Sequence, residues 1–299
     1  MLKLGDHCGQ YLCDLAKNDD RIWVIDGDLA DSDGAIHFSD EFPERFIMAG
    51  IAEQSMVSMA AGMASCGLRP WVFSFASFLV YRAYDQIRVC LSQCRQPVTL
   101  VGSHSGALTN RNGKTHAALN DIALMATLPF MQVWSPADLA DLHFSANKIL
   151  ANDLPAYLRL PRKIMPDIDG KPGAIRVIVP AQSITIISTG VGTQVAVDTH
   201  HRLAIKGIHA GLIHCLQLAP FPSEELRKEI EHVKRIFVIE DHIIYGGLYT
   251  LIQSLELDVK IVPIGWPQNW AGQSGPDESI MEMHGVSPGQ ICNRIIGCL

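Results

Sequence analysis

The chain has 299 residues, of which 48% are hydrophobic and 18% are charged, and its formal net charge is −7. This length predicts about two domains, and this composition excludes an intrinsically disordered chain, which combines low hydrophobicity with high net charge. No run of Lys and Arg exceeds two residues. The acidic balance therefore excludes a polyanion-binding surface, and nucleic acid is not an expected partner.

Strand-like runs alternate with helical patterns from the N-terminus onward, which is typical of an α/β fold with a mainly parallel sheet. In the first half, the strand-like runs are RIWVIDGDL, RPWVFSF, PVTLVGSH, MQVWSP and PAYLRLP. The helical patterns between them cover residues 53–66, 79–95, 117–128 and 137–150. We therefore predict a first α/β domain over residues 1–162.

Residues 163–183 concentrate Pro and Gly and interrupt the alternation, so we expect a linker there. The strand-like runs ITIISTG, HAGLIHCL and KRIFVIED follow, with helical patterns over 191–206, 223–231 and 245–256. They predict a second, smaller α/β domain over residues 184–299. The expected fold is two consecutive domains, each a mainly parallel sheet flanked by helices.

The cysteines and the apolar runs indicate the compartment. The eight cysteines are scattered and lack the paired spacings of a zinc site, so we expect reduced thiols and no metal site on this chain. The N-terminal segment lacks the apolar core of a signal peptide, and no apolar run is long enough to cross a membrane. We therefore expect a cytoplasmic protein without a membrane partner.

Three segments place polar or aromatic residues where a strand gives way to a helix. They are GIAEQSMVSMAAGMA at 50–64, FSFASFLVYRAYDQIR at 73–88 and GSHSGALTNRNGKTHAALNDIALM at 102–125. Because ligand loops gather at the carboxyl edge of a parallel sheet, we expect all three to converge there. Glu53, in the first segment, has a simpler explanation as a first-turn acid favoured by the helix dipole.

At these segments the chain resembles the C-terminal half of transketolases, over essentially its whole length. The first segment resembles the family's GIAEQ helix, the second its aromatic DQIR block and the third its Thr-His loop. In the second domain, VIEDHIIYGGLYT resembles the family's Glu-x-His turn at 240–247. The resemblance implies a pyrimidine-binding domain followed by a transketolase C-terminal domain.

The resemblance also implies the cofactor thiamine diphosphate. Glu53 corresponds to the acid that hydrogen-bonds ring nitrogen N1′ of the pyrimidine, which needs a dry site. The aromatic residues would form a flat slot, with Phe78 as the stacking partner. The cofactor-binding residues implied by the match are Glu53, Phe75, Phe78, Tyr81, Asp28 and Leu29.

The third segment carries the implied substrate site. His104 and His116 match the family's two substrate-facing histidines, which hydrogen-bond the donor ketose and help move its hydroxyl protons. Arg162 and Ser32 match residues that bind the substrate phosphate. Asn112 replaces the family's Asp, which contacts a substrate hydroxyl.

Further departures from the family pattern leave the substrate open. Two cations, Arg111 and Lys114, flank Asn112, and no Arg stands near Leu4, where the family has a second phosphate ligand. An ordinary pentose phosphate and an unusual anionic or differently substituted sugar both fit these residues.

The family's diphosphate-binding motif is not found in this sequence. Gly27-Asp28 is followed by Leu29 instead of Gly, and residues 47–60 contain no Asn. The resemblance therefore implies a separate partner subunit that binds the diphosphate and holds Mg²⁺ or a similar ion. We expect a heterotetramer with two copies of each chain.

The leading hypothesis is the pyrimidine-binding subunit of a split transketolase, which transfers a two-carbon ketol unit from a ketose or ketose phosphate to an aldose. Three alternatives remain. A deoxyxylulose phosphate synthase relative also has a Thr-His-Ala loop, and a 2-oxo acid dehydrogenase beta-type subunit shares the two-domain layout. The third is a non-catalytic homologue, against which Glu53, the aromatic residues and both histidines argue.

Overall fold

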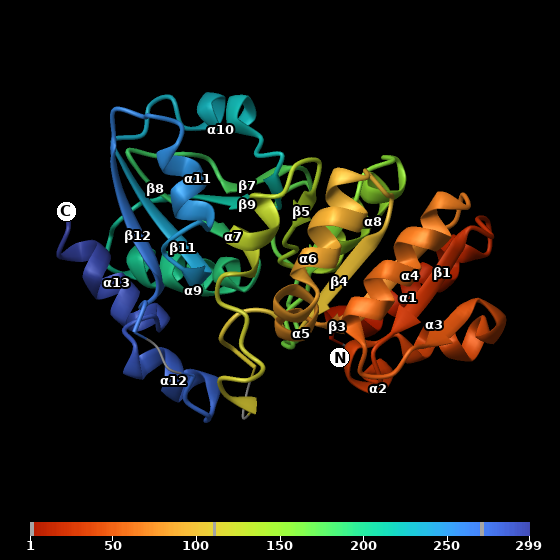
Figure 1. Cartoon of the computed structure of the whole chain (residues 1–299). Coiled ribbons are helices and arrows are strands. Elements are labelled where there is room, and N and C mark those ends of the chain that lie inside the picture. Colours follow the sequence, from red (N-terminus) through yellow and green to blue (C-terminus); the bar gives the residue numbers. More distant parts are fainter. Residues whose placement is uncertain (1–2, 110–111, 270–271) are drawn as a thin grey trace.

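Two β-sheets form the frame of the computed structural model (Figure 1), which describes residues 3–109, 112–269 and 272–299. The first sheet has the order β10-β5-β6-β4-β3-β1-β2, and the second has the order β12-β11-β8-β9-β7. The first sheet contains β1 (Ile22–Asp26), β2 (Phe46–Met48), β3 (Arg69–Phe75), β4 (Thr99–Ser103), β5 (Gln132–Trp134), β6 (Ala156–Arg159) and β10 (Gln217–Ala219). The second contains β7 (Ile175–Val179), β8 (Ile184–Thr189), β9 (Gly211–Cys215), β11 (Arg235–Ile243) and β12 (Lys260–Trp266).

Helices flank both sheets, so the expected fold of two mainly parallel α/β domains is confirmed (Figure 1). α4 packs on β3, α5 packs on β4, and α9 packs on β8 and β11. In the first domain the helices are α1 (Leu4–Ala16), α2 (Ala30–Asp33), α3 (Ile36–Glu41), α4 (Glu53–Ser65), α5 (Ala76–Arg82), α6 (Tyr84–Gln86), α7 (Asp121–Ala126) and α8 (Leu139–Leu150). In the second they are α9 (Val191–Ile205), α10 (Ser223–Glu229), α11 (Leu248–Gln253), α12 (Asp277–Met283) and α13 (Pro288–Ile296).

The segment 163–183 contains a strand, so the linker prediction is wrong for part of it. β7 pairs antiparallel with β9 and forms an edge of the second sheet. The reason lies in its residues, IRVIV, which are mostly β-branched and favour an extended strand once the preceding Gly and Pro have turned the chain.

One strand crosses between the domains. β10 lies within the second half of the chain, yet it pairs antiparallel with β5 and forms an edge of the first sheet. One continuous cluster of buried apolar side chains also includes Met56 and Leu100 of the first domain together with Ile187 and Ile213 of the second. The two domains therefore share a strand and a core.

Two helices near the expected site differ from their predictions. The helix predicted over 79–95 begins earlier, at Ala76, and is interrupted at Ala83 before a π-helical turn over Ile87–Gln93. The helix predicted over 117–128 is shorter and begins at Asp121, because Ala118 instead forms a β-bridge with Gly106.

The parallel strands β1, β3 and β4 end at the same edge of the first sheet. They end at Asp26, Phe75 and Ser103, and β2 ends beside them at Met48, a few residues before α4. The three segments singled out in the sequence therefore leave the sheet at one edge. Among the described helices, none combines the length and apolar character needed to cross a membrane.

Candidate active site

Glu53 is the first residue of α4 and lies almost completely buried, with 1% of its surface exposed. Its two carboxylate oxygens accept hydrogen bonds from Nη1 of Arg82, at 2.7 and 2.6 Å. The Arg82 side chain, at the end of α5, is 45% exposed, and its guanidinium lies 4.9 Å from the centre of the Phe78 ring. The carboxylate thus faces a planar cation that rests on an aromatic ring.

Phe75, Phe78 and the two histidines form one ring cluster. The Phe75 and Phe78 centroids are 5.6 Å apart with an interplanar angle of 27°. The His104 ring lies 4.0 Å from Phe75, and the His116 ring lies 5.7 Å from Phe75 and 5.1 Å from Phe78. The structure therefore brings these four residues together from β3, α5 and the loop after β4.

His104 is buried and has a left-handed backbone, with φ of 53°. Its Nδ1 lies 3.3 Å from Oγ of Ser103. Burial, helped by the charge of Arg162, lowers the pKa of His104 to about 3. The ring is therefore neutral at neutral pH, so it offers one donor and one acceptor nitrogen.

His116 is half-buried, and burial lowers its pKa as well. Its Nδ1 lies 2.8 Å from Oγ1 of Thr115. Together the two histidines provide neutral, hydrogen-bonding groups beside an aromatic wall, which suits contacts with sugar hydroxyls.

Tyr81 and the first-strand loop lie outside this ring cluster in the part of the chain that the structure describes. Tyr81 is 44% exposed, and its hydroxyl donates to Oδ1 of Asn120. Asp28 is exposed with φ of 68°, and the half-buried Leu29 donates its backbone N–H to Asp26 Oδ1 at 2.8 Å. Ser32 is half-buried in α2.

Arg162 and Asn112 belong to the rim of the third loop. Nη1 of Arg162 donates to the carbonyl of Thr109 at 3.2 Å, which ties the end of the first domain to that loop. Asn112 is exposed, and Arg111 lies outside the described residues. The second domain contacts this loop at Lys114, because a Cβ at Gly272 would lie 2.3 Å from the Cβ of Lys114.

Sequence reasoning missed two groups at this edge of the sheet. The first is Arg82, whose place in the aromatic block was the available signal. The second is a pair of fully buried carboxyl groups, Asp26 and Asp33, at the root of the first-strand loop. Burial and the neighbouring Asp26 raise the pKa of Asp33 to about 9, so the pair shares a proton at neutral pH.

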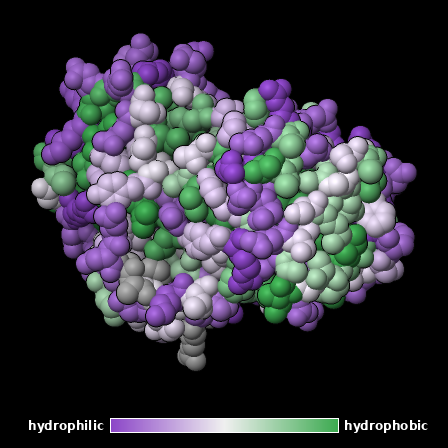
Figure 2. Space-filling view, viewed as in Figure 1, coloured by the Kyte–Doolittle hydropathy of each residue, from purple (hydrophilic) through white to green (hydrophobic). Residues whose placement is uncertain are grey.

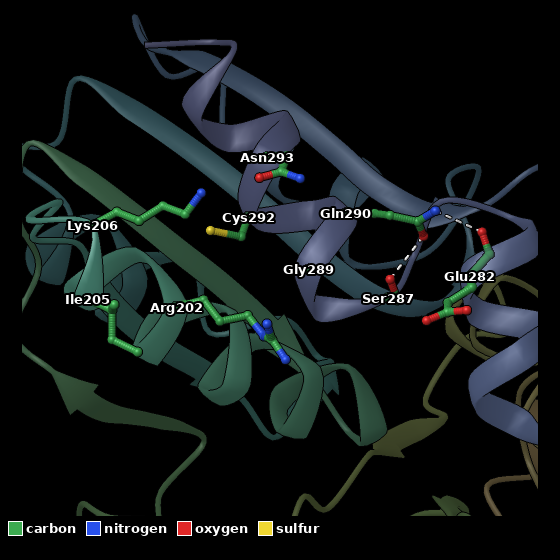
Figure 3. A pocket seen from close by; sticks show the side chains of 9 residues that line it. All are labelled: Arg202, Ile205, Lys206, Glu282, Ser287, Gly289, Gln290, Cys292 and Asn293. Carbon is green, nitrogen blue, oxygen red and sulfur yellow. Dashed lines mark hydrogen bonds between the residues drawn. The ribbon is translucent and has the colours of Figure 1, made fainter.

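A surface pocket of about 450 Å³ lies elsewhere, between α9 and α13 in the second domain (Figure 3). Arg202, Lys206 and Gln290 contribute to its walls, and none of the predicted site residues does. Within the described ranges, no group of three His, Cys, Asp or Glu side chains is placed to hold a metal ion. All eight cysteines are free thiols, and Cys66 and Cys94 are exposed.

Two family models match the chain. The model described as "Transketolase, pyrimidine binding domain" matches residues 1–167, and the one described as "Transketolase, C-terminal domain" matches residues 173–291. Among solved structures, a split-gene transketolase described as an inactive β4 tetramer superposes with a TM-score of 0.89 and 27% identity. The match covers 99% of this chain and 98% of that one.

Some curated relatives are about as long as this chain, and others are about twice as long. It is 31% identical to a putative transketolase C-terminal section of Methanocaldococcus jannaschii, over 96% of this chain and 93% of that protein. It is 32% identical to a 6-deoxy-6-sulfo-D-fructose transketolase subunit of a Clostridium species, over 82% of this chain and 78% of the subunit. It is 30% identical to the 1-deoxy-D-xylulose-5-phosphate synthase of Clostridium tetani over 96% of this chain, but it spans only 48% of that enzyme.

Proposed function

This chain belongs to the transketolase family, and we propose that it is the pyrimidine-binding subunit of a thiamine-diphosphate-dependent split transketolase. In this proposal it transfers a two-carbon ketol unit from a ketose or ketose phosphate to an aldose. The observation that carries the proposal is the convergence of Glu53, Phe78 and the two histidines at one sheet edge.

The residues around Glu53 fit the pyrimidine ring of thiamine diphosphate. The Arg82 guanidinium lies where we propose that the pyrimidine binds. Like that ring, it is flat and bears nitrogen; it donates to Glu53 and lies over Phe78. When bound, thiamine diphosphate supplies the nucleophilic carbon of ketol transfer. In the proposal, Glu53 holds a proton at ring nitrogen N1′, and Phe75, Phe78 and Tyr81 exclude water around it, with Phe78 stacking on the ring.

The first-strand loop would complete the cofactor site from this chain. Asp28 is exposed at the end of β1, and Leu29 is fixed beside it through its backbone bond to Asp26. In the proposal, both residues lie against the cofactor.

The two histidines would act on the donor sugar. A neutral His104 can accept a hydrogen bond from a sugar hydroxyl through one ring nitrogen and donate one through the other. His116 would bind an adjacent hydroxyl. The proposed roles are to orient the ketose and to move its hydroxyl protons.

The substrate class in this proposal is a sugar with an anionic end. Arg162, Ser32 and Lys114 would receive the anion, and the exposed Asn112 would contact a hydroxyl as a neutral group. The name of one relative refers to a sulfonated ketose, 6-deoxy-6-sulfo-D-fructose. That name supports a terminal phosphate or sulfonate without deciding between them.

A separate subunit would bind the diphosphate and Mg²⁺. Relatives that are themselves transketolase subunits or sections support this division. Exposed apolar side chains on β2, α4, α5 and the segment before α4 offer a surface for it, namely Met48, Ile51, Met59 and Tyr81. Figure 2 shows apolar surface over the lobe that contains α4. We propose a cytoplasmic heterotetramer with two copies of each chain.

The test is to purify this chain alone and after co-expression with the product of the neighbouring gene, and to measure ketol transfer with thiamine diphosphate and Mg²⁺. We expect activity only in the assembled complex. Full activity from the isolated chain would contradict the split-subunit proposal.

A deoxyxylulose phosphate synthase activity is the second candidate. The 30% identity to such an enzyme and the Thr115-His116-Ala117 sequence favour it. The same assay separates the two, because that synthase uses pyruvate as the donor and releases CO₂. We expect ketol transfer from a ketose and no release of CO₂ from pyruvate.

A further inference from the structure

The loop that carries the two histidines is closed by a short bridge. Gly106 and Ala118 exchange two backbone hydrogen bonds, each of 3.0 Å, so the two ends of the loop lie side by side. His104 lies just before the bridge and His116 just inside it. The bridge therefore sets how both histidines face Phe75.

The backbone at the start of this loop is strained. His104 has φ of 53°, a region that a residue with a side chain adopts at a cost, and Gly106 has φ of 78°. Such a conformation persists only where surrounding contacts over-determine it.

One such contact comes from the second domain. Asp241, on β11, is 4% exposed, and its Oδ1 accepts hydrogen bonds from the backbone N–H of Ala107 at 3.1 Å and from Nε1 of Trp266 at 2.6 Å. The Trp266 bond fixes the carboxylate, and the Ala107 bond attaches it to the loop. Asp241 thus joins β11 and β12 to the base of the histidine loop.

The carboxylate also sets how closely the loop approaches. A Cβ placed on Gly106 would lie 1.7 Å from Oδ2 of Asp241, so only glycine fits there. One residue past the bridge, Leu119 accepts a backbone hydrogen bond of 2.9 Å from Ile243 of the same strand. β11 therefore holds both sides of the bridge.

The buried Arg159 holds the backbone of Asp241. Nη2 of Arg159 donates to the backbone carbonyl of Asp241 at 2.8 Å, and its Nε donates to Oδ2 of Asp121 at 2.8 Å. Arg159 and Asp121 are both buried, so the pair resists displacement by water. Arg159 of the first domain thus fixes the backbone of Asp241, while Trp266 of the second domain fixes its carboxylate.

We propose that Asp241 is a positioning residue for His104 and His116, through which the second domain sets the substrate-facing loop of the first. Asp241 touches neither histidine. It acts through the Ala107 N–H and the packing of Gly106. This inference rests on the proposed function only where activity is measured.

The chain offers a matched control for testing this role. Glu240 is the neighbouring buried carboxylate on the same strand, and it accepts hydrogen bonds from the backbone N–H groups of Leu248 and Tyr249 at the start of α11. Losing it removes a buried carboxylate without touching the histidine loop. Asp241→Ala therefore removes a contact to the histidine loop, whereas Glu240→Ala removes contacts to the start of α11.

The first readout needs no activity. Amide hydrogen exchange of the isolated chain should speed up across residues 104–118 in Asp241→Ala, and across 248–253 in Glu240→Ala. Asp241→Asn keeps an acceptor oxygen for Ala107 and should retain the wild-type exchange. Unchanged exchange at 104–118 in Asp241→Ala would overturn the proposal.

The second readout is kinetic and uses the assembled complex. In Asp241→Ala we expect kcat/KM for the donor ketose to fall by about a hundredfold, since small misplacements of catalytic groups have effects of that size. The Kd for thiamine diphosphate should not change, because Glu53 and Phe78 lie on other elements. Asp241→Asn should restore kcat/KM to within about threefold.

Two results would overturn the proposal in the kinetic assay. One is an equal loss of kcat/KM in Glu240→Ala, and the other is a parallel loss of cofactor affinity in Asp241→Ala. If the Asp241→Ala chain does not fold, Gly106→Ala displaces the same contact. It should likewise lower kcat/KM for the donor ketose and leave the Kd for thiamine diphosphate unchanged. A wild-type complex without ketol transfer would contradict the proposed function instead, and hydrogen exchange would still decide the role of Asp241.

Discussion

Nη1 of Arg82 lies 2.7 and 2.6 Å from the two carboxylate oxygens of Glu53, and this pair occupies the place proposed for the cofactor pyrimidine. The carboxylate is buried and the arginine is half-exposed. Because the Arg82 guanidinium lies where the pyrimidine ring would lie, contact between Glu53 and a pyrimidine nitrogen requires the pair to open. Arg82 can swing toward solvent, whereas Glu53 cannot.

Replacing Arg82 by Ala should destabilise the isolated chain. The change leaves the buried Glu53 carboxylate without the cation that satisfies it, which costs about 1–2 kcal/mol of unfolding free energy after allowance for the exposure of the arginine. Urea denaturation measures it. The control is Arg88→Ala, which breaks an exposed pair with Asp85 and should change the free energy by less than about 0.5 kcal/mol. Equal losses in both variants would contradict the prediction.

Replacing Glu53 by Gln should remove activity but keep the fold. The amide can still accept a hydrogen bond from Arg82, but it cannot exchange a proton with ring nitrogen N1′. We expect kcat of the assembled complex to fall by about 10²- to 10⁴-fold. Thermal denaturation checks the fold, and Glu44→Gln, at an exposed acid, is the control. Wild-type turnover in Glu53→Gln would return Glu53 to the role of a helix-start acid.

Replacing Phe78 by Ala should weaken cofactor binding by the assembled complex. Ring stacking is worth about 0.5–1.5 kcal/mol beyond area burial, so we expect the Kd for thiamine diphosphate to rise by about three- to tenfold. Titration calorimetry measures it. Phe130→Ala is a matched control, because the Phe130 ring also carries an arginine, Arg95, at 3.9 Å. A similar rise in both variants would argue against a stacking role.

His104 should make the chain less stable in acid. Its pKa is about 3 when folded, whereas an unfolded histidine has a pKa of about 6.5, so between these values only the unfolded chain binds the proton. The stabilising contribution is therefore present above pH 6.5 and is lost as the pH falls toward 3. For one proton the slope is about 1.4 kcal/mol per pH unit.

The variant His104→Asn isolates this contribution, because Asn tolerates the left-handed backbone. Between pH 6.5 and 5, its unfolding free energy should fall by about 2 kcal/mol less than that of the wild type. His242, whose pKa burial lowers to about 4, keeps its own contribution in both proteins. Chemical denaturation at the two pH values measures the difference, and identical slopes would contradict the prediction.

Much of the fold could be predicted from the sequence, because strand and helix patterns are local. Glu53 was expected at the start of a helix and begins α4. The carboxyl-edge rule for parallel sheets predicts the convergence of three segments, which is seen in the Glu53–Arg82 pair and in the contacts of Phe75 with His104 and His116.

What could not be predicted depends on contacts between distant residues. Nothing local to Arg82 says that it reaches Glu53, which lies 29 positions earlier. The bond from Ala107 to Asp241 spans 134 positions, and it decides the path of the histidine loop. The loop also delays the start of a helix predicted from residue 117, because a bridge to Gly106 competes with helical hydrogen bonds at Ala118.

Because β10 comes from the second half of the chain but completes the first sheet, the two halves cannot be separated or exchanged independently. A fragment that stops before Gln217 leaves β5 at the edge of the first sheet with an unpaired row of backbone groups, which invites aggregation. A chimaera that exchanges the second domain also exchanges an edge strand of the first. We therefore expect recombination between relatives to exchange the two halves together.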